Sequence, residues 1–234
     1  MSIYKIADLL ISIPCKSEYA KNLMSDYLYS GTDCDFEIKI SNDDIMFEQN
    51  MAKGFSYGMY ESTAILRKLS NVILADYNGI MMHCALIAYK GKAYAFTAPS
   101  GTGKTTHIGI WKKCLGNQVE IINGDKPFIR YINGKPIAFG TPWQGKENLG
   151  KNISFPLDAI FMLKRGKENF ANEVKSDSAI FSLINSVAYP KNQSGKLKAL
   201  EFLEKLRHDV KIIELSCNME DSACYTALSA IKEN

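Results

Sequence analysis

The sequence has no Cys-x-x-Cys pair among its six cysteines, and it has only three histidines. The cysteines are therefore expected to be reduced, mostly buried thiols, and neither a structural zinc site nor a disulfide framework is indicated. The longest apolar runs, Val72–Ala75 and Ala85–Tyr89, are far too short to span a bilayer. The N-terminus also lacks the pattern of a signal peptide, so we expect a cytoplasmic protein with no membrane partner.

The excess of positive over negative charge is also small. The 28 Lys and Arg residues against 25 Asp and Glu give a net charge of +3, too small to indicate nucleic-acid binding, and no RNA-binding signature occurs. There are no internal repeats, and no Ser-His-Asp or Cys-His arrangement can be proposed from spacing. What the chain does have is 234 residues with 46% hydrophobic content, enough for a substantial core.

Apolar periodicity predicts a mixture of strands and helices. Strands are expected at Tyr4–Pro14, Asp35–Ile40, Ala85–Tyr89, Ala93–Pro99, Gln118–Ile122, Ala159–Leu163 and Val210–Leu215. Helices are expected at Glu18–Tyr29, Ser62–Asp76, Thr105–Leu115, Ser178–Val187, Lys196–Arg207 and Asp221–Lys232. Asn133-Gly134, between two alternating segments, predicts a hairpin with a type I′ turn.

This order of elements predicts an α/β fold with a mixed, partly antiparallel sheet rather than a strictly alternating doubly wound fold. Two domain divisions stay open. Residues 1–58 form a small N-terminal lobe ahead of a main domain at 59–234, or residues 1–234 form one continuous domain. The sequence does not fix the oligomeric state, and a homo-oligomer is one option.

The most informative segment reads Ala98-Pro-Ser-Gly-Thr-Gly-Lys-Thr-Thr-His107. It matches the P-loop pattern G-x-x-x-x-G-K-[ST], except that Ala98 replaces the first glycine. Glycines let successive N–H groups turn inward around an anion, and the following helix points its positive end at the same place. We therefore predict a P-loop at Ala98–Thr105. It would bind the phosphates of ATP through Ser100, Gly101, Thr102, Gly103, Lys104, Thr105 and Thr106.

Within this loop Lys104 is expected to reach the β- and γ-phosphates, and the Thr105 hydroxyl to bind Mg²⁺. A carboxylate partner follows in Asn123-Gly-Asp-Lys-Pro127, just after a predicted strand. Asp125 is expected to act as a metal ligand or as the base that takes a proton from a substrate hydroxyl. The alternative, that Asn-Gly-Asp is only a turn, stays open.

Two further segments carry candidate site residues. In Gly140–Glu147, Lys146 is expected to contact substrate or phosphate and Glu147 to face the substrate, while the alternative is a structural turn around a buried Trp143. Arg165, at a predicted strand end, is a candidate for stabilising charge on the transferred group, or is simply a surface arginine.

Three stretches resemble the superfamily of HPr kinase/phosphorylase and ATP-dependent phosphoenolpyruvate carboxykinase. They are Phe96–His107, Ile121–Pro127 and Phe139–Glu147. The short chain looks like a bacterial branch of HPr-kinase-related serine kinases. The resemblance implies a carboxykinase-like fold, ATP and Mg²⁺ as cofactors, and a serine-like acceptor. It also implies that His83, ahead of the loop, approaches the phosphates; otherwise His83 is a core or turn histidine.

The chain departs from the pattern of these families, which commonly have two adjacent aspartates in the second motif. Here the motif reads Gly124-Asp125-Lys126, so one carboxylate is missing and Glu147 or Glu61 becomes an alternative base.

Three functions are compatible with these sequence features. The first is a kinase acting on a hydroxyl of a peptide, protein or small molecule. The second is a non-catalytic nucleotide-binding module, and the third is a phosphorylase or carboxykinase.

Overall fold

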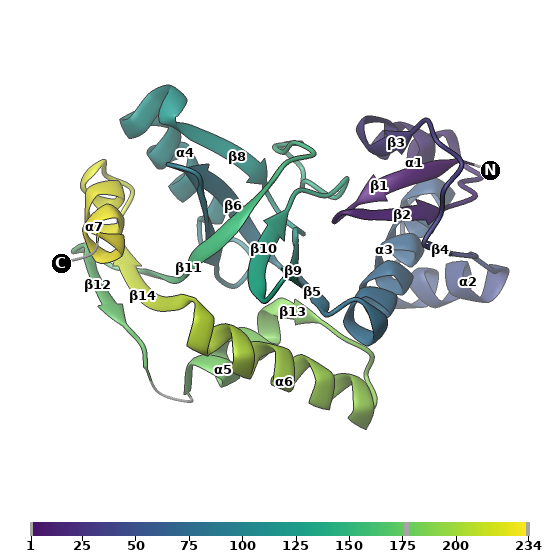
Figure 1. Ribbon diagram of the computed structural model, residues 1–234. Coiled ribbons are helices and arrows are strands. Elements are labelled where there is room, and N and C mark those ends of the chain that lie inside the picture. Colours follow the sequence, from purple (N-terminus) through teal and green to yellow (C-terminus); the bar gives the residue numbers. More distant parts are fainter. Residues whose placement is uncertain (1, 176–177, 233–234) are drawn as a thin grey trace.

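The computed structural model describes residues 2–175 and 178–232, and its strands form two sheets (Figure 1). The smaller sheet has the order β3-β1-β2-β4. Its strands are β1 (Ile3–Ile6), β2 (Leu9–Ser12), β3 (Leu28–Tyr29) and β4 (Phe36–Glu37). Three helices accompany it, namely α1 (Glu18–Leu23), α2 (Asn42–Met51) and α3 (Tyr57–Asp76). The long helix α3 then leads into the larger sheet.

The larger sheet follows the order β13-β5-β9-β10-β11-β7-β6-β8, and β14 joins it by pairing with both β11 and β12. Its strands are β5 (Gly79–Met82), β6 (Cys84–Tyr89), β7 (Lys92–Thr97), β8 (Val119–Asn123), β9 (Phe128–Ile132), β10 (Lys135–Phe139), β11 (Ser154–Arg165), β12 (Phe170–Glu173), β13 (Val187–Ala188) and β14 (Lys211–Cys217). Strand β11 runs parallel to β7 and β14, whereas β6 pairs antiparallel with β7 and β8. The mixed sheet predicted from the sequence is confirmed.

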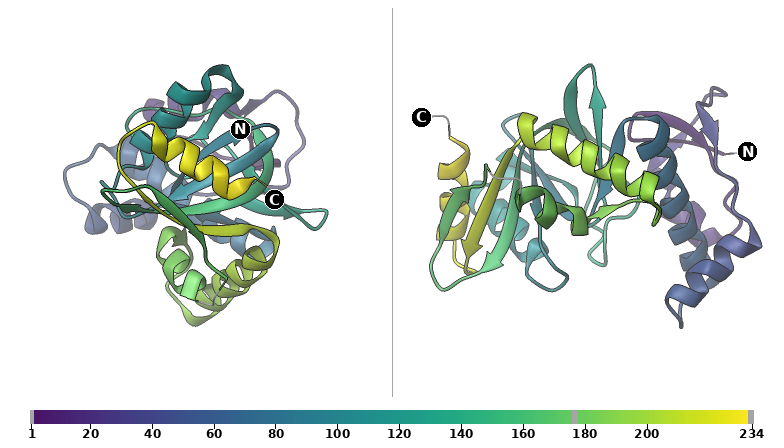
Figure 2. Two further views of the ribbon diagram at one scale, coloured as in Figure 1. Left: turned by 90° about the vertical axis from the view of Figure 1, so that its left-hand side faces the viewer. Right: turned by 90° about the horizontal axis from the view of Figure 1, so that it is seen from below.

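Helices cover both faces of the larger sheet. They are α4 (Lys104–Leu115), α5 (Ser178–Leu183), α6 (Gln193–Asp209) and α7 (Ser222–Ile231). Figure 2 shows the pair α5 and α6 lying together along one side. Ala93 and Ala95 of β7 face the core under α6, while Tyr94 and Phe96 face the core under α4. This alternation leaves β7 buried on both faces, which fixes the position of the loop that follows it.

The core of the smaller sheet continues into the larger one. It joins residues of β1 and β2 to one side of α3, and it extends to Phe128, Phe139 and Trp143. Ion pairs from Arg67 on α3 to Asp44 and Glu48 hold α2 against the same helix. The division at residue 58 stays a prediction, but this shared core gives the two sheets a continuous apolar contact.

Several sequence expectations were wrong in this first region. Tyr4–Pro14 is not one strand, because Ala7 and Asp8 adopt positive φ values of 53° and 60° and turn the chain into the β1–β2 hairpin. The helix expected at Glu18–Tyr29 ends at Leu23 and gives way to a 3-10 helix at Ser25–Tyr27. Helix α2 was not predicted, and neither was β12 in the larger sheet.

Elsewhere most expectations were confirmed, with shifted boundaries. Asn133 and Gly134 have φ values of 51° and 78°, as the type I′ turn of the β9–β10 hairpin requires. Helix α3 begins at Tyr57 rather than Ser62, because Ser56 caps it by accepting from the Met59 amide. Strand β11 begins at Ser154, five residues before the expected start. Within the described residues, no helix has both the length and the apolar character needed to span a membrane.

Candidate active site

The candidate phosphate loop, residues 98–105, connects β7 to the start of α4. Gly101 and Gly103 adopt φ values of +77° and +119°, which other residues rarely reach. Gly103 occupies the N-cap position of α4, and no side chain caps the helix there. The first-turn amides are therefore left to bind an anion, and the helix dipole favours negative charge at this end.

Lys104 lies under this loop with only 8% of its surface exposed. Its Nζ donates to the Ala98 carbonyl oxygen at 3.0 Å, so the ammonium is held within the loop. Burial lowers the pKa of Lys104, and the nearby negative charge of Asp125 opposes that shift. The substitution of Ala98 for glycine leaves this contact intact because the acceptor is a main-chain carbonyl.

Asp125 is positioned by a fully buried residue that sequence reasoning missed, Asn123 at the end of β8. The Asn123 Oδ1 accepts from the amides of Asp125 and Lys126 at 2.9 and 2.8 Å. Its Nδ2 donates to the carbonyl and hydroxyl oxygens of Thr141, both at 3.0 Å. This arrangement makes the Asn-Gly-Asp segment a turn with a fixed geometry, and that geometry directs a carboxylate toward the candidate phosphate loop.

Two basic side chains contact the Asp125 carboxylate. His83 Nε2 lies 3.0 Å from Oδ1, and Lys126 Nζ forms an ion pair with Oδ2. Burial favours the protonated acid, but the hydrogen bonds from His83 and Lys126 outweigh it and hold the pKa of Asp125 at about 2. The carboxylate is therefore charged at neutral pH. His83, which sequence reasoning linked to the phosphates, contacts this carboxylate directly.

This pairing has a consequence for stability against pH. The pKa of Asp125 in the folded chain, about 2, is below its ordinary value of 3.8. Its stabilising contribution is then complete above pH 4 or so and is lost as the pH falls toward 2. Between about pH 5 and about pH 3, wild type should lose roughly 1 kcal/mol more unfolding free energy than Asp125→Asn does. Urea unfolding of both proteins at each pH measures this, and an equal loss would contradict it.

Position 124 cannot carry a side chain in this conformation. A Cβ atom on Gly124 would lie 2.7 Å from the main-chain oxygen of Gln144 and 3.3 Å from that of Leu149. The segment that follows β10 therefore packs directly against the turn. The space that a side chain at position 124 would need is filled by main chain.

The main cleft, a cavity of about 940 Å³, brings most predicted site residues together. It is lined by Ser100, Gly101, Gly103, Lys104, Thr105, Thr106, His83, Gly124, Asp125, Lys126, Trp143, Gln144, Gly145, Lys146, Glu147, Asn148 and, from α1 and α3, Tyr19, Leu23, Met59, Ser62 and Thr63. The contribution from α1 and α3 had no signal in the sequence. Sequence segments more than 100 residues apart thus face one volume.

A second cavity of about 450 Å³ adjoins the other side of the candidate phosphate loop. Thr102, Thr106 and His107 line it, with apolar side chains of Ile110, Leu163 and Met219. His107 is buried and accepts a hydrogen bond from Trp111 Nε1 at 3.1 Å. Burial lowers the pKa of His107 to about 4, so its ring is neutral at pH 7.

Arg165 belongs to this second side and does not line the main cleft. Its guanidinium donates to the carbonyl oxygens of Gly101 and Thr102, so it contacts the outer edge of the loop. Glu61, considered as an alternative base, is completely buried, and its oxygens accept from the Lys16 and Ser17 amides at 2.7 and 2.8 Å. It holds α1 to α3 and is unavailable to a ligand. Glu147 remains in the cleft.

Thr105 and Asp125 both line the main cleft, as the metal prediction requires. Mg²⁺ usually takes one or two carboxylates plus phosphate oxygens and water, so one carboxylate and one hydroxyl fit its chemistry when a nucleotide supplies the rest. In the described part of the chain, no group of three His, Cys, Asp or Glu side chains forms a metal site of its own. A metal here would depend on the phosphates.

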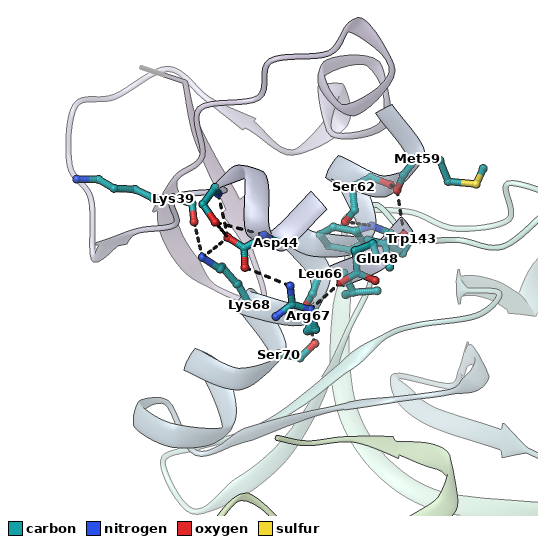
Figure 3. A network of polar contacts seen from close by, with 12 residues as sticks. Lys39, Asp44, Glu48, Met59, Ser62, Leu66, Arg67, Lys68, Ser70 and Trp143 are labelled. Atoms are coloured by element: carbon teal, nitrogen blue, oxygen red, sulfur yellow. Dashed lines mark hydrogen bonds and ion pairs between the residues drawn. The ribbon is translucent and has the colours of Figure 1, made fainter. Parts of the chain in front are cut away.

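The loop at residues 143–148 is anchored to α3 through its first residue, Trp143. Trp143 is 7% exposed, and its Nε1 donates to the Ser62 carbonyl on α3 at 3.1 Å (Figure 3). The indole therefore fixes the position of the segment that carries Lys146 and Glu147. The structural and functional interpretations of this segment are compatible, because a packed tryptophan can position cleft residues.

No family model matches the chain, and no curated protein matches it. Among solved structures, the chain is similar to the Hpr(Ser) kinase/phosphatase from Coxiella burnetii, with a TM-score of 0.37 and 6% sequence identity. That comparison covers 64% of this chain and 95% of the other. A likeness this distant establishes neither family nor activity, so the proposals below depend on the geometry of the site.

Proposed function

We propose that this protein is an ATP- and Mg²⁺-dependent kinase that transfers the γ-phosphoryl group to a serine-like hydroxyl. One observation supports this most directly: Lys104, Thr105 and Asp125 face the same cleft beside an uncapped helix N-terminus. A cation, a hydroxyl and a carboxylate around an anion-binding loop are the parts that phosphoryl transfer needs. Most of the catalysis would come from positioning and charge neutralisation.

The two cavities suggest how a nucleotide would lie. We propose that the triphosphate occupies the candidate phosphate loop and that the base and ribose extend past Thr106 into the second cavity. The apolar side chains of Ile110, Leu163 and Met219 suit the face of an aromatic base. Arg165 would then act by holding the loop carbonyls, which keeps the loop amides directed at the phosphates.

In the transfer step, the acceptor oxygen forms a bond to the γ-phosphorus while the bond from that phosphorus to the β–γ bridging oxygen breaks. The acceptor proton moves to the Asp125 carboxylate, and ADP carries the released charge. A carboxylate with a pKa of about 2 is a weak base. We propose that Lys126 turns toward the phosphates when nucleotide binds, which removes one cation from Asp125 and raises its basicity. Bound Mg²⁺ would neutralise phosphate charge beside Thr105 and Asp125.

A second candidate function is a nucleotide-binding module without catalysis. It is favoured by Gly124, where main chain excludes a second carboxylate, and by the engagement of both Asp125 oxygens with His83 and Lys126. One carboxylate would have to serve as both metal ligand and base. A phosphorylase or carboxykinase activity has no specific support in the cleft.

The deciding experiment is turnover of γ-labelled ATP with Mg²⁺, offered serine-containing peptides, free amino acids and a cell lysate. We expect label to move to an acceptor with wild type and not with Lys104→Ala. ATP binding by calorimetry, measured in parallel, separates the two candidates. Binding without any transfer would favour the module, and the absence of binding would refute both.

A further inference from the structure

We infer that Cys114 and Cys224 form a redox-active thiol pair, which a peroxide converts to a disulfide that joins α4 to α7. Cys114 lies in the last turn of α4, and Cys224 lies in the first turn of α7. Their side chains hydrogen-bond to each other, so the two sulfur atoms are neighbours although the residues are far apart in the sequence. Neither cysteine lines the main cleft or the second cavity, so this inference does not depend on the proposed function.

A shared partner, Asp221, brings the two cysteines together. Its main-chain oxygen lies 3.9 Å from Cys114 Sγ and accepts from the Cys224 amide at 3.1 Å. Its carboxylate oxygens accept from Lys113 Nζ at 2.7 and 2.8 Å. Asp221 therefore fastens the end of α4 to the start of α7 through both its main chain and its side chain. A disulfide requires cysteines whose backbones are already close, and these contacts provide that proximity.

The two thiols differ in access to solvent. Cys114 is partly exposed, whereas Cys224 is buried in the core that α4, α7 and β14 share. A peroxide therefore reaches Cys114 first. Burial and the neighbouring Cys114 together raise the pKa of Cys224 to about 12, so Cys224 stays protonated at neutral pH. Oxidation of Cys114 removes the charge of its thiolate, and with it one cause of the raised pKa of Cys224.

The reaction has two steps, written here for hydrogen peroxide. The Cys114 sulfur attacks one peroxide oxygen, the O–O bond breaks, and a sulfenic acid and a water molecule form. The Cys224 sulfur then attacks the sulfenic sulfur, so an S–S bond forms and the S–O bond breaks. The hydroxyl leaves as a second water with the Cys224 proton. The two thiols together lose two electrons and two protons, and the peroxide is reduced to water.

The crosslink acts on the walls of the second cavity. Helix α4 contributes Thr106, His107 and Ile110 to that cavity, and the segment that precedes α7 contributes Met219. A disulfide between the end of α4 and the first turn of α7 limits the movement of these two walls relative to each other. Oxidation therefore restricts this region without any ligand, and α4 begins at the candidate phosphate loop.

The test treats the whole chain with hydrogen peroxide at neutral pH, in a Cys34→Ser background, and then alkylates the remaining thiols. Cys34 is exposed, so its removal prevents disulfides between molecules. We expect a mass loss of about 2 Da and a proteolytic fragment pair joined through Cys114 and Cys224, both reversed by dithiothreitol. Amide hydrogen exchange in the first turn of α7 should slow by about ten-fold or more on oxidation.

Two further variants make the assignment specific. Trypsin leaves Cys217 and Cys224 on one fragment, 212–232, so Cys217→Ser is the matched control and should form the crosslink as the background protein does. Cys217 is also partly exposed, but its sulfur lies 3.9 Å from His107 Nδ1. Cys224→Ser removes the resolving thiol, so Cys114 should remain a sulfenic acid that dimedone traps.

Three outcomes would overturn the inference. The first is a crosslink that maps to another cysteine pair or that disappears in Cys217→Ser. The second is oxidation of Cys114 while Cys224 stays a free thiol in the Cys34→Ser background. The third is exchange in α7 that slows equally in Cys224→Ser, because the restriction would then not come from the disulfide. A failure of ATP binding would refute the proposed function and would leave this thiol pair unaffected.

Discussion

Replacing Asp125 with Asn is expected to lower phosphoryl transfer by about 100-fold or more while ATP affinity stays within about three-fold of wild type. The amide keeps the size of the side chain and its contact with His83 but cannot take a proton. The amide also cannot form an ion pair with Lys126, and the negative charge at this position in the main cleft is lost. Single-turnover rates with saturating ATP measure the chemical step, and calorimetry measures binding.

The matched control is Asp158→Asn, which also converts a paired carboxylate to an amide. Asp158 pairs with Lys92 at 2.7 Å and does not line the main cleft. Transfer by this control should equal that of wild type. Undiminished transfer by Asp125→Asn would refute Asp125 as the base and make Glu147 the remaining carboxylate candidate in the cleft.

Replacing Lys104 with Ala should have the larger effect, abolishing transfer and weakening ATP binding by about ten-fold or more. The ammonium is buried under the candidate phosphate loop, where no other described lysine has its amino group bonded to a loop carbonyl. Burial disfavours the charged form of the Lys104 amine, so replacing Lys104 with Ala should not lower the free energy of unfolding. Loss of function without loss of stability would identify Lys104 as a ligand-binding lysine.

Lys112 provides an internal comparison for this variant. It lies on the same helix and also donates from Nζ to a main-chain carbonyl, that of Val119 at 2.8 Å, but away from the loop. Lys112→Ala should bind ATP normally and should lose only the stability of that contact. If Lys104→Ala and Lys112→Ala bind ATP equally well, residues 98–105 are not the nucleotide site.

The sequence predicted those parts of the site that depend on short-range backbone geometry. Gly101 and Gly103 have the positive φ values that the glycine pattern indicated, and Asp125 follows its strand as expected. These features are local, because a glycine-rich loop between a buried strand and a helix has few other conformations. The same holds for the Asn133-Gly134 turn.

Features that depend on contacts between distant segments could not be predicted. Asn123 determines the direction of Asp125, yet its partner Thr141 lies 18 residues away, and an Asn-Gly pair normally indicates only a turn. The cleft residues Tyr19, Leu23 and Met59 lie on α1 and α3, and their place beside the candidate phosphate loop depends on the packing of the smaller sheet against the larger one. Glu61 was an alternative base on sequence grounds, but its carboxylate is completely buried and accepts from the amides of Lys16 and Ser17.

The close approach of main chain to Gly124 bears on how this sequence can evolve. An aspartate at position 124 would place its Cβ against the main-chain oxygens of Gln144 and Leu149, so this substitution is expected to distort the turn. A carboxylate at position 124 would require the 144–149 segment to move, and Trp143, which precedes that segment, is anchored to α3. A carboxylate at position 124 and a rearrangement of the 144–149 segment would therefore have to arise together.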